Sequence, residues 1–361
     1  MPTHVVATIA TRNDFRGIGR RIRCVLFLFS LFLVATTTRA QVAGLSSLSP
    51  LDLPSDARAS ALGLEWLAVA SSDNLQRLDN PSLFYDNRRD VSLTIAPLFD
   101  RSTFGAIAYS FDSPHLGYWV VGLRFVNYGS FDGYDENDQP TGTFHAGDYM
   151  LVGGWGLPID SNFSVGVALK PVYSQYESYK AFGIAVDMGA TYMSDNRHFV
   201  ASVMARNIGR QFLAYDGSSH RLPFELAAHC SYKLQKAPFR FFAALNELQR
   251  WNLRYEDPLN PSSTTDPFTG EVSSDSDAKV FFDRLARHVA VGIELDLKGK
   301  FFLRVGYNYR QTRETQYVGN SNGSGFSFGA AITGKRLDVS YGRNNYHLSQ
   351  AVNYFSLNFH L

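Results

Sequence analysis

Short patterns in this chain could belong to a hydrolase that forms an acyl-enzyme. Penicillin-type chemistry uses S-x-x-K, S-D-N and K-T-G, in which the serine is the nucleophile. The chain has Ser276-Asp-Ala-Lys279, and S-D-N occurs at 72–74 and 194–196. Both S-D-N copies precede the S-x-x-K, K-T-G is absent, and Ser276 lies in the polar stretch SSDSDAK. We interpret the match as coincidence and predict that the chain is not an enzyme.

Two other groups of residues could carry chemistry. The histidines could activate a serine, but a lone histidine specifies little. The acidic stretch DGYDENDQ (132–139) offers oxygen ligands for calcium, but it lacks the spacing of the calcium loop D-x-[DN]-x-[DN]-G-x5-E. We expect no metal site, no cofactor and no catalytic residue. The histidines considered are His198, His229, His288, His347 and His360.

The first forty residues are typical of a secretory signal peptide. The basic stretch RGIGRRIR (16–23) precedes the apolar run CVLFLFSLFLVA (24–35), and Thr38 and Ala40 precede the predicted cleavage site after Ala40. Twelve apolar residues are too few to span about 30 Å of hydrocarbon. Removing this segment takes away six of the 34 basic and one of the 33 acidic residues. The resulting slight acidic excess gives no indication of nucleic-acid binding.

Beyond residue 40, apolar residues alternate with small or polar ones, which predicts β-strands. In FSVGVALK, Phe163, Val165, Val167 and Leu169 share one face. No apolar run of 18 residues follows, which excludes helical membrane spans. The fourteen predicted strands are 91–97, 103–112, 117–128, 147–157, 162–172, 181–194, 198–209, 222–234, 238–248, 287–298, 300–311, 324–333, 336–342 and 351–361.

The lengths of the connections distinguish a membrane barrel from a soluble sandwich. Connections after even-numbered strands are short, as in GLPIDSN and DLKGK, whereas most of the others are long and polar. Outer-membrane barrels combine an even strand number with short periplasmic turns and longer outer loops. We therefore predict an all-β fold, a fourteen-stranded antiparallel transmembrane barrel of the outer membrane over residues 89–361. Its longest extracellular loop would be 249–287.

Residues 41–88 are predicted to form an N-terminal periplasmic or plug segment. Ala57, Ala61 and Leu64 allow a short helix, for which Asp56 could be the N-cap. Asn80-Pro81 would end the helical stretch. Such a segment could plug the barrel lumen.

Longer stretches resemble a known family. LPSDARASALG (53–63) followed by NPSLF (80–84) resembles the N-terminal pattern of the FadL-like and PorV-like outer-membrane barrels. RWNLRYEDPLNP (250–261) and SYGRNNYHL (340–348) are similar to one branch, the PorQ family of the type IX secretion system, and the similarity extends over nearly the whole mature chain. The resemblance implies a location in the cell outer membrane of a Bacteroidetes-type bacterium.

The same resemblance implies a function and partners. The protein would be the outer-membrane anchor subunit of the type IX attachment complex and would hold a surface component, PorZ, for cargo processing and cell-surface attachment. PorU and PorV would complete the complex, and outer-membrane lipid and lipopolysaccharide would surround it. The alternative is a FadL-like channel for hydrophobic small molecules, with the N-terminal segment as a movable plug.

The loop 249–287 carries the candidate partner-binding residues. Trp, Tyr and Arg dominate binding hot spots, and a loop of this length is usually functional or disordered. KVFFDRLARH (279–288) predicts a short amphipathic helix. The loop could bind a partner or pack over the barrel mouth. The candidate partner-binding residues are Trp251, Arg254, Tyr255, Phe268, Phe281 and Phe282.

Overall fold

The computed structural model describes most of the chain that follows the predicted signal peptide. The described residues are 48–70, 73–83, 89–99, 101–113, 117–215, 221–254, 263–265, 272–274, 276–314, 323–345 and 351–361. The predicted signal peptide and its cleavage site lie outside this range.

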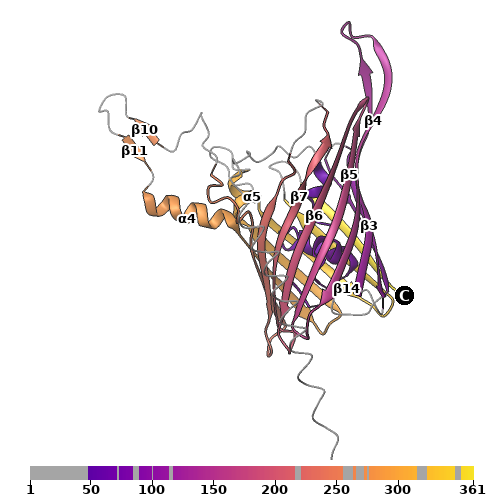
Figure 1. The fold of residues 1–361 in the computed structure, drawn as a ribbon. Helices are drawn as coiled ribbons and strands as arrows, with labels where there is room; N and C mark the ends of the chain where they lie inside the picture. The colour runs from indigo at the N-terminus through magenta and orange to yellow at the C-terminus, as the bar shows by residue number, and fades with distance from the viewer. Residues whose placement is uncertain are drawn as a thin grey trace, which may run out of the picture. The chain divides into compact units, whose positions relative to one another are not determined.

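Fourteen antiparallel strands close into a barrel (Figure 1), which confirms the predicted fold class. The first strand, β1, pairs with the last, β16, in the register Asp90↔His360. The strands are β1 (Asp90–Pro97), β2 (Thr103–Ser113), β3 (Gly117–Tyr134), β4 (Pro140–Pro158), β5 (Phe163–Tyr176), β6 (Tyr179–Met193), β7 (Phe199–Leu213), β8 (Glu225–Lys233), β9 (Phe239–Leu245), β12 (Val289–Leu297), β13 (Phe301–Asn308), β14 (Phe326–Thr333), β15 (Leu337–Asn344) and β16 (Val352–His360). Because β16 is paired on both sides, the barrel has no open edge.

The remaining elements, short helices and one small sheet, are not part of the barrel wall. They are η1 (Ser49–Leu51), α2 (Ala57–Ala61), α3 (Asn74–Asp79), α4 (Asp277–His288), α5 (Tyr309–Glu314) and the pair β10 (Ser263–Thr265) and β11 (Val272–Ser274). Within the described ranges, no helix has the length and apolar character needed to cross a membrane.

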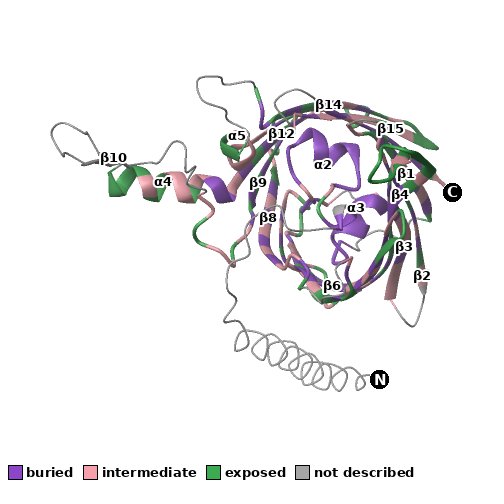
Figure 2. Cartoon of the chain, turned by 90° about the horizontal axis from the view of Figure 1, so that it is seen from above, coloured by how far each residue is buried: buried purple, intermediate pink, exposed green. Residues whose placement is uncertain are grey.

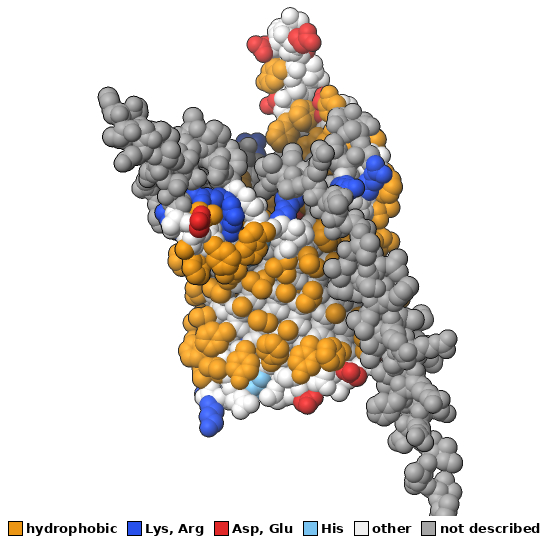
Figure 3. All heavy atoms as spheres, turned by 60° about the vertical axis from the view of Figure 1, so that its left-hand side comes forward, with side chains coloured by type: hydrophobic (Ala, Val, Ile, Leu, Met, Phe, Trp, Pro, Cys, Tyr) orange, Lys and Arg blue, Asp and Glu red, His pale blue; other side chains and the backbone are white. Residues whose placement is uncertain are grey.

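The two faces of the wall differ in character. On β13, Phe301, Leu303 and Val305 point outward and are exposed, while Arg304 and Gly306 point inward and are buried. Figure 3 shows the outward side chains as a hydrophobic band around the wall. An apolar exterior with a polar interior is the pattern of a barrel in contact with lipid.

Short and long connections lie at opposite ends of the barrel, as predicted. Part of a predicted long loop, however, forms strands. Residues 159–162, 194–198 and 298–300 are short turns at one end of the barrel. At the other end, much of the predicted polar loop after residue 128 continues the β3–β4 hairpin instead. The predicted strand end at 309–311 is wrong, because α5 begins at Tyr309.

The N-terminal segment lies inside the barrel (Figure 2), and we call residues 48–83 the plug. Asp56 is the N-cap of α2 as predicted, and its Oδ1 accepts a hydrogen bond from the Ala59 amide at 2.6 Å. The helix ends at Ala61 with Leu62 as its C-cap, and Gly63 follows with a φ of +68°, a left-handed conformation that favours glycine. Helix α3 lies in the second half of the plug and has Asp73 as its N-cap.

Candidate functional site: the plugged lumen

The first half of the plug binds the wall through a buried cluster of charges. Arg58 of α2 forms two bonds with Glu294 of β12, at 2.9 Å and 2.7 Å. Arg304 of β13 reaches the same carboxylate at 2.8 Å, and Arg240 of β9 lies 3.9 Å from it. A carboxylate that accepts two parallel N–H bonds from a guanidinium is held in a fixed orientation. This cluster therefore fixes where α2 sits against the wall.

The second half of the plug is attached through a separate ion pair. Asp79 of α3 lies 2.9 Å from Arg124 of β3, and both side chains are buried. Ser55 donates to the same carboxylate from its amide at 3.0 Å and from its hydroxyl at 2.7 Å. Arg124 also donates to the Leu53 carbonyl. Because Ser55 and Asp79 lie at the two ends of the plug, this site ties the segment to itself and to the wall.

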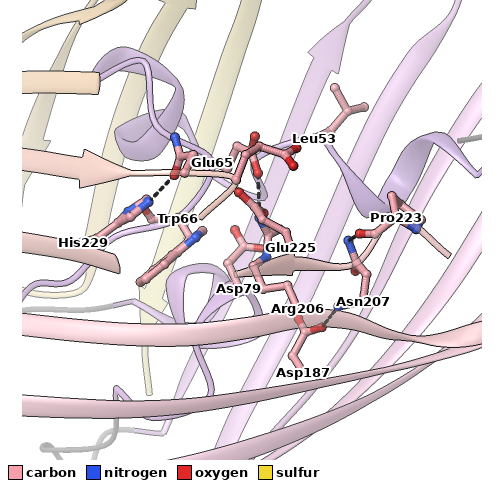
Figure 4. A network of polar contacts seen from close by, with 12 residues as sticks. Leu53, Glu65, Trp66, Asp79, Asp187, Arg206, Asn207, Pro223, Glu225 and His229 are labelled. Atoms are coloured by element: carbon pink, nitrogen blue, oxygen red, sulfur yellow. Dashed lines mark hydrogen bonds and ion pairs between the residues drawn. The ribbon is translucent and has the colours of Figure 1, made fainter. Parts of the chain in front are cut away.

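A third contact joins the middle of the plug to β7 and β8 (Figure 4). Arg206 of β7 lies 2.6 Å from Glu65 of the plug and 2.8 Å from Glu225 of β8. Beside it, the rings of Trp66 and His229 stack with centroids 3.7 Å apart. His229 Nδ1 also lies 2.9 Å from the Trp66 carbonyl oxygen. Each part of the plug therefore has its own charged or polar partner on the wall.

Three wall glycines allow the plug backbone to approach closely. A Cβ on Gly306 would lie 2.1 Å from the carbonyl carbon and oxygen of Leu62. A Cβ on Gly342 would lie 2.2 Å from the Ala57 carbonyl oxygen, and one on Gly166 would lie 2.0 Å from that of Pro81. In all three cases the clash is with backbone, which cannot rotate away as a side chain can.

We expect Gly306→Ala to loosen the plug, because the new methyl group would overlap the plug backbone at Leu62. Overpacking of this kind typically costs about 1–3 kcal/mol. The measurement is the rate at which a protease cleaves the plug in the purified, folded barrel. Gly153→Ala is the matched control, since a Cβ there meets nothing within 4 Å. Equal cleavage rates in the two variants would mean that Gly306 does not seat the plug.

Four of the six predicted partner-binding residues are described, and they lie away from the lumen, at the rim where the long connections are. Trp251 is exposed, and its ring lies 5.7 Å from that of Phe281 on α4. Arg254 and Phe282 line one cavity of about 430 Å³ beside α4. The structure thus brings these four residues to one region, and α4 confirms the predicted amphipathic helix. The other two candidates, Tyr255 and Phe268, lie outside the described residues.

Helix α4 also accounts for the S-x-x-K match. Ser276 is the N-cap of α4, and its hydroxyl accepts a bond from the Lys279 amide at 3.4 Å. A serine in this position satisfies a backbone N–H that the helix itself leaves without a partner. Among the residues that the structure describes, no group of three or more His, Cys, Asp and Glu side chains could hold a metal ion.

The charged residues that hold the plug were not identified from the sequence. They lie on the inward parity of the strands, where the alternation predicts only that side chains face the lumen. The available sign of such a role was a charged residue on an otherwise small or apolar inner face. This pattern occurs at Arg124, Arg206 and Glu294. Their partners on the plug are more than forty residues away along the chain, so no spacing rule could have paired them.

Comparison with known proteins shows the fold. No protein-family model matches the sequence, and no curated protein matches it. The chain is similar to the toluene transporter TodX of Pseudomonas putida, with a TM-score of 0.50 and 11% identity, over 86% of this chain and 99% of that one. It is also similar to a FadL homologue of Pseudomonas aeruginosa (TM-score 0.45, 12% identity, 86% and 98% covered) and to the monoaromatic hydrocarbon channel CymD (0.47, 10%, 87% and 99%).

The likeness to TodX establishes that the chain has the fourteen-stranded fold of the FadL-like outer-membrane barrels. At 11% identity it establishes the fold alone. The predicted membership of the PorQ branch has no support from these comparisons and stays a prediction, as does the absence of enzymatic activity.

Proposed function

We propose that the protein is an outer-membrane channel for hydrophobic small molecules, closed in the state described here by the plug. The observation that carries the proposal is the way the lumen is filled. The described residues of the plug lie inside the barrel and form none of its strands, so the plug can leave without breaking the strand ladder. A gated channel needs a segment that can leave the lumen while the strands of the barrel stay paired.

Two further facts support this proposal. The hydrophobic band on the outside would place the barrel in a lipid bilayer, where hydrophobic compounds concentrate. The fold is shared with TodX, a toluene transporter in Pseudomonas putida. The experiment is the uptake of a labelled monoaromatic hydrocarbon with the plug free and with the plug pinned to the wall.

A second candidate function is that of an anchor for a surface protein, as the predicted PorQ-like role implies. The observation that favours it is the β3–β4 hairpin. Strand β2 pairs with β3 only as far as Asn127, and β5 pairs with β4 only from Ala146. Beyond these positions the hairpin is a two-stranded ribbon that projects past the rim (Figure 1), with Phe131 and Tyr134 exposed. Such a ribbon offers backbone and aromatic contacts to another protein.

Deletion of residues 132–143 is expected to release a surface protein if the chain is an anchor. The measurement is affinity purification of the full-length chain from its native outer membrane, followed by mass spectrometry. The deleted chain should still show the heat-dependent gel mobility of a folded barrel, which serves as the control. PorZ, PorU or PorV in the wild-type sample, and not in the deleted one, would favour the anchor. Recovery of the same partners with both chains would reject the hairpin as the docking site.

A further inference from the structure

Helix α4 has one apolar face, and this face is exposed at the barrel rim. It consists of residues at the i, i+3, i+4, i+7 spacing that places side chains on one side of a helix, namely Ala278, Phe281, Phe282 and Leu285. Phe281 and Phe282 are 49% and 66% exposed. Trp251, itself 52% exposed, extends the face from a neighbouring turn, with its ring 5.7 Å from that of Phe281. An exposed apolar patch of this kind marks a surface that contacts a membrane or another protein.

The charged side of α4 is fastened to α5. The carboxylate of Asp283 accepts hydrogen bonds from Arg287 at 2.9 Å and from the Tyr309 hydroxyl of α5 at 2.8 Å. Arg313 of α5 lies 3.5 Å from the same carboxylate. Successive residues are about 100° apart around a helix, so Asp283 points away from the middle of the apolar face. These contacts hold α4 in one rotation about its axis, with the middle of the apolar face turned away from α5.

The junction of α4 with the wall fixes the depth of the helix. The helix passes directly into β12 at Val289, which pairs with Leu245 of β9, an exposed residue on the outer face. Two residues further on, Val291 pairs with Tyr307 of β13, which in turn pairs with Phe326 of β14. The rings of Tyr307 and Phe326 lie 4.8 Å apart. Outer-membrane barrels carry girdles of aromatic residues at the membrane interface. Helix α4 therefore joins the wall at the border between the hydrocarbon and the polar interface.

The direction of α4 is that of a helix lying on a membrane. Figure 1 shows α4 leaving the rim sideways rather than along the barrel axis. Figure 2, seen from above, shows it pointing away from the lumen. Its twelve residues make a helix about 18 Å long. An amphipathic helix in this position buries its apolar face about 5–10 Å into the boundary between headgroups and acyl chains. The surface that continues the hydrophobic band of the barrel is thus the one that this face meets.

We propose that α4 is an interfacial helix that binds the lipid of the outer leaflet. The side chains of Phe281, Phe282 and Leu285 lie among the acyl chains, and Trp251 lies beside them at the depth where tryptophan is enriched. The contact is made by apolar side chains, so it requires no particular headgroup. The helix then holds the C-terminal part of the 249–287 loop on the membrane beside the barrel and not over its mouth. This assignment depends only on the barrel lying in a membrane and holds for a channel or an anchor.

The first test measures the depth of single nitroxide labels on the full-length barrel in phospholipid vesicles. The label is attached after Phe282→Cys on the apolar face or after Arg284→Cys on the far side of the helix, in both cases with Cys230→Ser to remove the free thiol. Oxygen, which concentrates in lipid, and a water-soluble nickel chelate compete to relax the label. The ratio of oxygen to nickel accessibility is expected to be at least about fivefold higher at position 282 than at 284, because only the first label lies among acyl chains.

Two reference labels complete this measurement. Ile293→Cys places the label on the hydrophobic band of β12, and Tyr134→Cys places it on the ribbon that projects past the rim. The label at 282 should match that at 293. A label at 282 that matches the one at 134 would place the face in water and overturn the proposal. A label at 282 that neither reagent reaches would show that protein covers the face, which would also reject the lipid assignment.

The second test asks whether apolar character alone keeps α4 in the membrane. In vesicles, trypsin is expected to cut slowly at Lys279 and Arg284, since a helix must open locally before a protease can cleave it. Phe281→Ser with Phe282→Ser should be cut at least about tenfold faster, because two apolar rings no longer hold the helix in lipid. Phe281→Leu with Phe282→Leu is the matched variant and should stay protected.

Equal cleavage of the serine and leucine variants would contradict the proposal, because lipid distinguishes apolar from polar side chains and not one apolar shape from another. The same holds if the serine variant is cut no faster than the wild type. Phe131→Ser on the hairpin is the control for an exposed aromatic residue outside α4, and it should leave cleavage at α4 unchanged. All variants must keep the heat-dependent gel mobility of a folded barrel.

Discussion

Replacing Arg124 with methionine is expected to release the plug from a barrel that still folds. The substitution leaves Asp79 buried without the guanidinium that lies 2.9 Å away. Removing one partner of a buried ion pair typically costs about 3–5 kcal/mol, because the remaining charge has lost its solvation and its counterion. That cost falls on the plugged state alone, since water can solvate Asp79 once the plug has left. The ratio of open to plugged barrels should therefore rise by more than about a hundredfold.

The measurement is protease cleavage of the plug in the folded barrel, together with ion conductance in a planar bilayer. Arg124→Met combined with Asp79→Asn is the matched variant, because the neutral amide leaves no unpaired charge and its oxygen can still accept from Ser55. The double variant should regain much of the protection that the single variant loses. Full protection of the plug in Arg124→Met would show that the plug is held by its other contacts and that this ion pair does not decide its position.

The barrel could be predicted from the sequence because strand alternation and turn length depend on residues that are close together in the chain. Alternation along FFLRVGYN identifies which face of β13 meets lipid, and short turns such as Lys298 to Lys300 show which ends are joined tightly. The same reasoning located α4, whose apolar spacing is visible within twelve residues. The β3–β4 ribbon was missed because its polar, glycine-containing strands have no buried face to set an alternation.

The contacts of the plug could not be predicted in the same way. Asp56 follows a local capping rule and was identified as an N-cap, whereas α2 ends at Ala61 and not at the predicted Asn80-Pro81. The pairings Arg58–Glu294 and Asp79–Arg124 join positions 236 and 45 residues apart, and they depend on where the segment lies within the closed wall. The roles of Gly306 and Gly342 could not be predicted either, because the sequence does not show which backbone segment will pack against a glycine in a strand.

Pinning the plug to the wall is expected to abolish uptake of hydrophobic compounds. Ser82 of the plug and Thr191 of β6 have their hydroxyl oxygens 2.6 Å apart, which places the two side chains within reach of a disulfide if both become cysteine. Cys230 is replaced with serine in this variant, since it is a free thiol on β8. Oxidation then holds the plug in the lumen, and reduction frees it again. The variant with Ser82→Cys alone is the control, because it cannot form the bond.

The central claim is that the plug must move for the barrel to conduct, and the most direct measurement is hydrocarbon uptake by this double-cysteine barrel before and after reduction. Cells or vesicles that carry the protein are given labelled toluene, and its entry is followed over time. If the plug must move, uptake stays at background in the oxidised state and recovers on reduction to the rate of the single-cysteine control. Uptake at the control rate while the disulfide is intact, or background uptake in both states and in the control, would contradict it.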